Sequence, residues 1–241
     1  KTAVADIKNL SLTGYQVIKY TLDESKYDGG AKNINSIPLI RYAEVLLNYA
    51  EAKAELGTLT PEDIALTVDV VRDRVGMPAL DMTAANNNPD PLMASYYPNV
   101  NSGANKGVIL EIRRERTVEL LMENLRYWDI MRWKEGKTFE QPLLGLYIPS
   151  KGEYDLDGDG TPDIYLKTKG ETPSTKAPLI MEIDQDIFLS EGDHGYISPH
   201  KKNPGEWNEA RDYYYPIPTD DRSLTGGALT QNPGWNDGLN F

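Results

Sequence analysis

The longest regular pattern of apolar residues in the chain runs from Val108 to Trp133. Apolar side chains recur there at spacings of three and four, which predicts one long amphipathic helix. They are Ile109, Ile112, Val118, Leu121 and Leu125. The other faces carry Arg and Glu side chains, many of them one helical turn apart. The simplest interpretation is a solvent-exposed charged face, on which each ion pair adds a few tenths of a kcal/mol.

Two shorter helices are predicted earlier in the chain. Between Pro38 and Gly57, leucines and alanines at helical spacing predict a helix that packs closely on a neighbour. A second helix is expected from Thr60, an N-cap before a proline, to Val75, where Gly76 ends it. Two antiparallel helices of this length are typical of one tetratricopeptide unit. The predicted fold class is therefore mainly α, a tetratricopeptide-like superhelical scaffold with long irregular loops and a few short strands.

Weaker patterns surround these helices. Residues 1–36 have the turn residues of an extended lead-in, with a short alternating strand at 14–22. Residues 82–106 and 140–212 lack a helical period and are predicted as loop-rich insertions within a single domain that spans 1–241. Loops longer than about 15 residues inside compact domains are usually functional or disordered. Residues 82–106 are therefore a candidate ligand-binding loop.

Composition limits the classes of partner. The 241 residues include 37 acidic and 25 basic side chains, which gives a net charge of −12. Nucleic acids and anionic membrane surfaces would repel such a chain, whereas neutral ligands would not be affected. The absence of cysteine excludes disulfides, thiolate zinc sites and thiol catalysis. No stretch reaches the roughly 18 apolar residues of a transmembrane helix, and no signal peptide opens the chain.

Four separated segments carry a family resemblance. They are IPLIRYAEVLLNYAEAKAELG at 37–57, VRDRVGMPAL at 71–80, VILEIRRERTVELLMENLRYWDIMRW at 108–133 and YYYPIPTDDRSLTGGALTQNPGW at 213–235. In their order and residue patterns they resemble the C-terminal half of the SusD/RagB family of nutrient-binding outer-membrane lipoproteins. Members of that family have about twice this length and begin with a lipidated cysteine. We therefore expect this chain to be a fragment that lacks the N-terminal half of the family fold.

The resemblance implies capture of a nutrient and no chemistry. It implies a lipid-anchored protein on the outer face of the outer membrane of a Bacteroidetes-type bacterium, anchored through a part outside this fragment. Such a protein grips an oligosaccharide or polysaccharide and acts as a lid on a SusC-like TonB-dependent transporter. A peptide-capturing relative of the RagB type is the alternative, and the net acidity would then favour basic peptides. A carbohydrate-active hydrolase that uses paired carboxylates is a more distant alternative.

Candidate ligand-binding residues come from the side chains alone, because the family's ligand contacts vary and the resemblance assigns none. Tyr96 and Tyr97 are adjacent aromatics that can stack on the apolar faces of sugar rings. Asn99 and Asn101 offer donors and acceptors to hydroxyl groups. Trp207, in a polar segment, is a candidate by the same logic as the tyrosines. The alternative for these aromatics is that they fix their loops against the helices. The remaining tryptophans are expected to be core anchors: Trp128, Trp133 and Trp235.

The segment YDLDGDGTPDIY at 154–165 predicts a calcium site. Asp155, Asp157, Asp159 and Asp163 occupy positions 1, 3, 5 and 9 of an acidic calcium loop, and the carbonyl of Thr161 would supply the ligand at position 7. A leucine stands where an EF-hand has its bidentate Glu, so the loop is closer to those of extracellular calcium repeats. The alternative is a solvated acidic turn. We expect calcium in a structural role and no organic cofactor.

The sequence contains no recognisable catalytic constellation. His194 and His200 lie six residues apart in a Gly- and Pro-rich segment, a spacing that places neither on a helical face. Ser198 lies between them, but without a G-x-S-x-G motif or an apparent third member of a triad. The chain also lacks a G-x-G-x-x-G motif and a P-loop. We therefore predict a binding protein and assign no catalytic residue.

Overall fold

The computed structural model describes residues 12–27, 30–101 and 103–239, and the chain divides into two compact units. The helical unit contains residues 22–139 and 207–241, and the strand unit contains residues 1–21 and 140–206. With 35% helix and 8% strand, the fold is mixed, where a mainly α fold was predicted. Within the described ranges, no helix combines the length and apolar character needed to cross a membrane.

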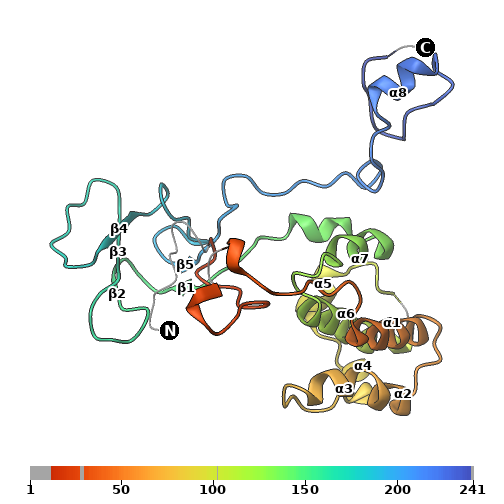
Figure 1. Ribbon diagram of the computed structural model, residues 1–241, viewed down its shortest axis with the longest axis horizontal. Coiled ribbons are helices and arrows are strands. Elements are labelled where there is room, and N and C mark those ends of the chain that lie inside the picture. The colour runs from red at the N-terminus through yellow and green to blue at the C-terminus, as the bar shows by residue number, and fades with distance from the viewer. Residues whose placement is uncertain (1–11, 28–29, 102, 240–241) are drawn as a thin grey trace. The chain divides into compact units, whose positions relative to one another are not determined.

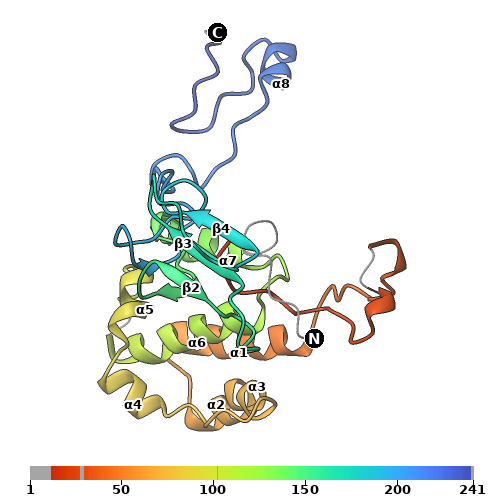
Figure 2. The ribbon, with the colours of Figure 1, turned by 90° about the vertical axis from the view of Figure 1, so that its left-hand side faces the viewer.

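Helices α1 (Tyr42–Glu55) and α6 (Lys106–Glu119) lie side by side at the centre of the helical unit (Figures 1 and 2). They are antiparallel: Arg41, just before α1, bonds to Glu123 beyond the end of α6 at 2.9 Å. At the other end, the Asn105 side chain donates to the Ala54 carbonyl at 3.4 Å. The other α-helices are α2 (Pro61–Leu66), α3 (Val68–Asp73), α4 (Met82–Asn87), α5 (Pro91–Tyr96), α7 (Arg126–Trp133) and α8 (Thr219–Leu224). Short 3₁₀ helices lie at Ser25–Tyr27, Gly30–Lys32, Gly103–Asn105 and Gly136–Glu140.

The long helix predicted over residues 108–133 is two helices, α6 and α7. Between them, Met122 and Asn124 have φ angles of 64° and 62°. Residues in the left-handed region cannot continue a right-handed helix, so the chain turns there and restarts at Arg126. The apolar period continues across the turn because both helices bury their apolar faces in one core, with Ile109 and Ile112 from α6 and Ile130 from α7. The spacing of the apolar residues therefore gives no sign of the break between α6 and α7.

The second predicted helix is also interrupted. Its start is confirmed: the Thr60 hydroxyl accepts from the Asp63 amide at 3.2 Å, and the Asp63 carboxylate accepts from the Thr60 amide at 2.9 Å, which forms a capping box. The helix then breaks at Thr67, with φ −128° and ψ −84°, so that α3 begins at Val68. The first helix begins at Tyr42 and not at Pro38.

Two regions predicted as irregular contain regular structure. Residues 82–106 hold α4 and α5, whose first turns are capped by the carboxylates of Asp81 and Asp90. These helices are too short to show a helical period in the sequence. Residues 140–212 contain five strands of the described chain. The strand expected at 14–22 is absent, because the described residues there form turns and irregular backbone.

Three of the charged residues of α6 are buried, contrary to the expectation of a solvated face. Arg113, Glu115 and Arg116 are each less than a tenth exposed. Their ion pairs reach other segments of the helical unit. Arg113 pairs with Glu135 at 3.0 Å, Glu115 with Arg72 at 2.6 Å, and Arg116 with Asp129 at 2.9 Å. The charges thus cross-link the helices through the interior, where a lost partner costs far more than on the surface.

The strand unit contains two small sheets. Strands β2 (Gly152–Tyr154), β3 (Ile164–Lys167) and β4 (Leu179–Glu182) lie side by side, with β2 antiparallel and β4 parallel to β3 (Figures 1 and 2). Strands β1 (Tyr147–Ile148) and β5 (Gly195–Tyr196) form an antiparallel pair. The unit has its own apolar core of Ile148, Ile164, Leu166, Met181, Ile183, Ile187, Leu189 and Ile197.

Candidate functional site

Six rings of the helical unit form a continuous series of contacts, which we call the aromatic surface: Tyr127, Trp128, Phe139, Trp207, Tyr213 and Tyr215. Neighbouring ring centroids lie between 5.0 Å apart, for Trp207 and Tyr213, and 6.3 Å apart, for Tyr127 and Tyr215. Three members are open to solvent: Trp128 is 55% exposed, Phe139 40% and Tyr215 65%. The other three rings, Tyr127, Trp207 and Tyr213, are partly buried, so the series is accessible along part of its length.

Helix α7 and the segment that returns to the helical unit at residue 207 supply these rings. The buried face of α7 carries Asp129, Ile130 and Trp133, which turns Trp128 outward. Phe139 follows in the 3₁₀ helix Gly136–Glu140. The remaining rings come from residues 207–215, far away in the sequence. Only the docking of this segment against α7 and the 3₁₀ helix completes the surface.

Gly136 fixes the position of Trp207. A Cβ atom on Gly136 would lie 1.9 Å from Cε2 of Trp207, so the indole packs directly against the glycine backbone. The Gly136 amide also donates to the Tyr213 hydroxyl at 2.9 Å. Backbone and ring packing together hold the central part of the aromatic surface. A larger residue at position 136 would displace Trp207.

Two phenol groups of the aromatic surface, those of Tyr127 and Tyr213, stay protonated at neutral pH. A hydrogen bond with Tyr215, with a smaller effect of burial, raises the pKa of Tyr127 to about 12. Burial also raises the pKa of Tyr213, although the bond from Gly136 opposes it. Both phenols therefore act as neutral donors and acceptors. Ring faces flanked by uncharged hydroxyls match the alternation of C–H faces and hydroxyl groups on a sugar.

The acidic loop predicted to bind calcium is the connection of the β2–β3 hairpin. Oxygen atoms of Asp155, Asp157 and Asp159 lie within 4.8 Å of one another, on exposed side chains. The two carboxylate oxygens of Asp155 accept from the amides of Gly158 and Gly160, at 2.7 Å and 2.8 Å. These bonds curl the loop so that three carboxylates converge, an arrangement of hard oxygen donors that fits a calcium ion.

The other two members of the predicted calcium set, Asp163 and Thr161, form hydrogen bonds within the loop. The Asp163 carboxylate accepts from the Leu156 amide at 2.7 Å and closes the loop at its base. Thr161 donates both its amide and its hydroxyl to Asp159, and these bonds lower the pKa of the Asp159 carboxyl. Asp159 is therefore ionised over the whole physiological range. The local geometry brings the carboxylates of Asp155, Asp157 and Asp159 together.

The sequence model of the SusD family matches residues 1–235 of the chain. This chain belongs to the SusD family. Four chains of solved structures match it, among them a SusD-like protein from Bacteroides fragilis NCTC 9343, with 22% sequence identity and a TM-score of 0.47. That match covers 82% of this chain and 25% of the other, so the chain spans about a quarter of the length of that SusD-like protein. No protein with curated annotation matches.

Among the ligand-binding residues predicted for this SusD-family chain, Tyr97 is a core residue. It is 1% exposed, and its ring meets Trp133 edge to face at 5.6 Å. Its hydroxyl accepts from Arg126 at 2.6 Å. This corrects the expectation that Tyr97 stacks on a sugar, because both faces of the ring are covered. Tyr96 is partly buried against the same core, and its carbonyl accepts from the Thr138 hydroxyl at 2.6 Å.

The two predicted asparagines are both exposed, and Asn99 takes part in hydrogen bonds. The Asn99 side chain donates to the Lys134 carbonyl at 2.6 Å, and its amide donates to Glu135 at 3.1 Å, so it joins α5 to the end of α7. Asn101 is exposed. Trp207 lies within the aromatic surface, where its ring contacts Phe139 and Tyr213. Trp133 is buried as expected.

Sequence reasoning missed five of the six members of the aromatic surface. Trp128 was expected in the core, because aromatic residues on an amphipathic helix usually pack inward. Its exposure corrects that expectation. Trp235, the remaining tryptophan, is partly buried, and the Arg211 guanidinium lies 4.7 Å above its ring. The run of three tyrosines at 213–215 was a signal, but its partner segment could not be identified without the tertiary contacts.

Proposed function

We propose that this chain is part of a SusD-like protein that captures neutral oligosaccharides at the cell surface. In this proposal the parent protein is lipid-anchored on the outer face of the outer membrane and passes its ligand to a SusC-like TonB-dependent transporter. The observation that carries the proposal is the aromatic surface, with exposed rings at Trp128, Phe139 and Tyr215. The antiparallel α1 and α6 would belong to a tetratricopeptide-like scaffold that presents it.

Neutral glycans fit this surface better than charged ligands do. The rings carry no formal charge, and the raised pKa of Tyr127 keeps its hydroxyl neutral. Stacking of sugar C–H faces on the rings would supply most of the affinity, and the phenol hydroxyls would set the orientation. The chain's net charge of −12 disfavours polyanions. Peptide capture of the RagB type is the competing outcome, and it would show a stronger dependence on salt.

Calcium has a structural role in the same proposal. The converging carboxylates of Asp155, Asp157 and Asp159 repel one another without a cation. We propose that calcium holds the β2–β3 connection in one conformation, at the millimolar concentrations outside the cell that suit weak sites. The ion takes no part in capture at the aromatic surface.

The test is calorimetric titration with neutral plant, host and microbial oligosaccharides. Trp128→Ala and Tyr215→Ala should each weaken binding about tenfold, since loss of a stacked ring removes about 1–1.5 kcal/mol. Tyr42→Ala is the matched control, because Tyr42 is 72% exposed on α1 and lies outside the aromatic surface. An equal loss in the control would refute the assignment of the surface. Saturable binding of peptides alone would replace the glycan proposal with peptide capture, and release of reducing sugar would indicate a hydrolase.

A further inference from the structure

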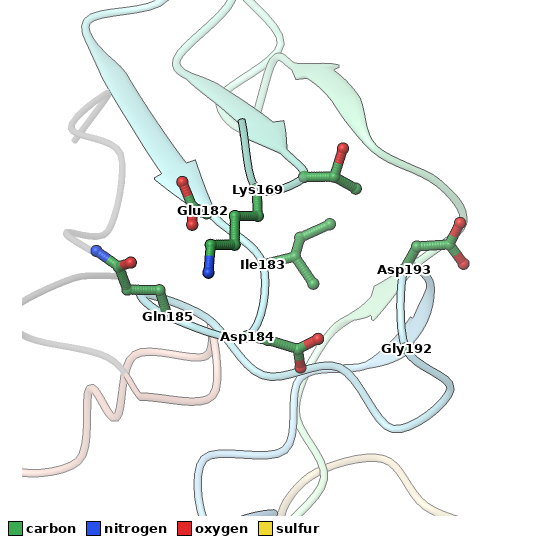
Figure 3. A pocket seen from close by; sticks show the side chains of 8 residues that line it. Lys169, Glu182, Ile183, Asp184, Gln185, Gly192 and Asp193 are labelled. Atoms are coloured by element: carbon green, nitrogen blue, oxygen red, sulfur yellow. The ribbon is translucent and has the colours of Figure 1, made fainter. Parts of the chain in front are cut away.

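A pocket of about 580 Å³ lies in the strand unit (Figure 3). Its volume is within the range of about 300–1,000 Å³ typical of small-ligand sites. Lys169 lies just beyond β3, and Glu182 at the end of β4 is followed by the turn that contains Asp184. Asp193 also lines the pocket and lies in the connection between Leu189 and Ile197, which form an antiparallel bridge. The pocket is separate from the aromatic surface, which belongs to the helical unit.

The backbone of the pocket is held in place by hydrogen bonds. The Ile183 amide donates to the Lys167 carbonyl at 2.9 Å and extends the parallel pairing of β3 and β4. The Asp184 amide donates to the Ile187 carbonyl at 2.8 Å, and Lys202 Nζ donates to the Asp184 carbonyl at 2.8 Å. Asp184 has a φ angle of 66°, so the turn contains a left-handed backbone conformation that few residue types adopt readily. A pocket formed in advance loses little conformational entropy when a ligand binds.

Several polar side chains at the pocket have hydrogen-bonding capacity to spare. Across residues 12–27, 30–101 and 103–239, no ion pair or hydrogen bond engages the side chains of Lys169, Asp184 or Gln185. Figure 3 shows the Lys169 ammonium and the Gln185 amide on one side of Ile183, with Asp193 on the other side. Asp184 lies below them in the same view. Ile183, a core residue that is 6% exposed, lines the pocket between these polar groups.

The charges of the pocket favour an uncharged ligand. The charge of Glu182 is offset by Lys167, whose ammonium lies 2.7 Å from the Glu182 carboxylate. Asp193 lies 2.9 Å from His194, and the other lining charges, Asp184 and Lys169, are opposite in sign, so the lining has no excess of cations to attract uronic acids, sulfates or phosphates. The Lys169 ammonium opposes a cationic ligand in turn. Hydroxyl groups suit both kinds of side chain, because each hydroxyl can donate to a carboxylate and accept from an ammonium or amide.

We propose that this pocket is a second binding site of the protein and that it takes a neutral sugar unit. The vicinal hydroxyls of the sugar donate to Asp184 and Asp193 and accept from Lys169 and Gln185. The C–H face of the sugar rests on Ile183. The ligand class rests on the proposed function, whereas the site is independent of the aromatic surface.

The experiment is a titration of the ¹⁵N-labelled chain followed by NMR. The neutral probes are maltose, cellobiose and N,N′-diacetylchitobiose, with galacturonic acid as the anionic probe and glucosamine as the cationic one. Backbone amides at 168–169, 182–185 and 192–193 report on the pocket, and the Trp128 indole N–H reports on the aromatic surface. The variant is Lys169→Met with Asp184→Asn, since Asn tolerates a positive φ as well as Asp does. Lys176→Met, at an exposed lysine that does not line the pocket, is the control.

The expected result is saturable shifts of the pocket amides with at least one neutral disaccharide. The double variant should bind it at least tenfold more weakly, and Lys176→Met should bind as the parent does. Shifts at the Trp128 indole with none at the pocket amides would overturn this inference and leave the proposed function standing. Shifts at the pocket amides alone would support the inference and count against the aromatic surface. Pocket shifts with only the charged probes would overturn the neutral ligand class, and no shifts at either site would refute both proposals.

Discussion

Arg116 cross-links three helices from the interior of the helical unit, and its loss should destabilise that unit strongly. The side chain is 3% exposed and bonds to both oxygens of Asp129 on α7, at 2.9 Å and 3.1 Å. On α1 it donates to Asn48 at 2.6 Å and lies 3.4 Å from the Glu51 carboxylate. Replacement by methionine keeps most of the volume but removes the charge. Both carboxylates then remain buried with one cation fewer.

The expected cost follows from this arrangement. Removing one partner of a buried ion pair costs about 3–5 kcal/mol, because the other charge stays desolvated. Arg132 remains beside the two carboxylates, 2.8 Å from Asp129 and 2.7 Å from Glu51. We therefore expect Arg116→Met to lower the free energy of unfolding by an amount near the lower limit, about 3 kcal/mol. The surface control is Arg74→Met, whose side chain is 61% exposed in its pair with Glu119 and should cost less than about 1 kcal/mol.

Urea unfolding followed by tryptophan fluorescence measures this difference. All four tryptophans lie in the helical unit, so the signal reports on that unit alone. At a slope of about 2 kcal/mol per molar urea, a loss of 3 kcal/mol lowers the midpoint by about 1.5 M. A double-mutant cycle with Asp129→Asn should give a coupling energy of at least about 1 kcal/mol. If Arg116→Met shifted the midpoint no more than Arg74→Met does, the charges of α6 would be solvated and the cross-linking argument would be wrong.

Three further predictions concern other parts of the chain. Asp157→Ala with Asp159→Ala should abolish the rise in melting temperature that calcium produces in the parent protein, and a calcium-dependent shift that survives in this variant would exclude the loop as the site. Gly136→Ala should cost about 1–3 kcal/mol of stability and change the tryptophan emission spectrum, because the new methyl group would overlap the Trp207 ring; unchanged emission and stability would contradict that packing. Burial by itself would raise the pKa of Glu51, but hydrogen bonds from Arg132 and Trp133 hold this pKa below the usual 4.5. The Glu51 carboxylate therefore stabilises the fold above about pH 4.5, and this stabilisation is lost as the pH falls through the lower pKa of the folded state. Unfolding free energies measured from pH 6 to pH 3 should therefore fall less steeply for Glu51→Gln than for the parent protein, and parallel curves would refute the assignment.

Local signals in the sequence predicted local structure well. The capping box of Thr60 and Asp63 depends on residues three positions apart, and the structure forms it. The convergence of Asp155, Asp157 and Asp159 likewise depends on alternate residues of one turn. Interactions of this range are decided by the backbone geometry of a few neighbouring residues. They can be predicted because no distant segment has to be placed first.

The breaks in the helices were not predictable in the same way. Met122 and Asn124 adopt left-handed conformations that neither residue type requires. They do so because α6 and α7 must both present apolar faces to one core. Arg113 and Arg116 are buried for a related reason, since acidic partners from other elements enclose them. A charged residue on a helix has the same sequence pattern whether water or another helix faces it.

The sequence by itself determined that the chain contains capped helices, an acidic calcium-type loop and the motifs of the SusD family. Each of these depends on neighbouring residues or on the order of segments along the chain. The tertiary structure alone decided that Tyr97 is covered, that Trp128 is open to solvent and that Trp207 contacts Phe139, whose ring in turn contacts Tyr127 of α7. It also formed the pocket at the ends of β3 and β4. The physical reason is that exposure and ring contacts depend on which distant segments pack together, and a linear pattern contains that information only weakly.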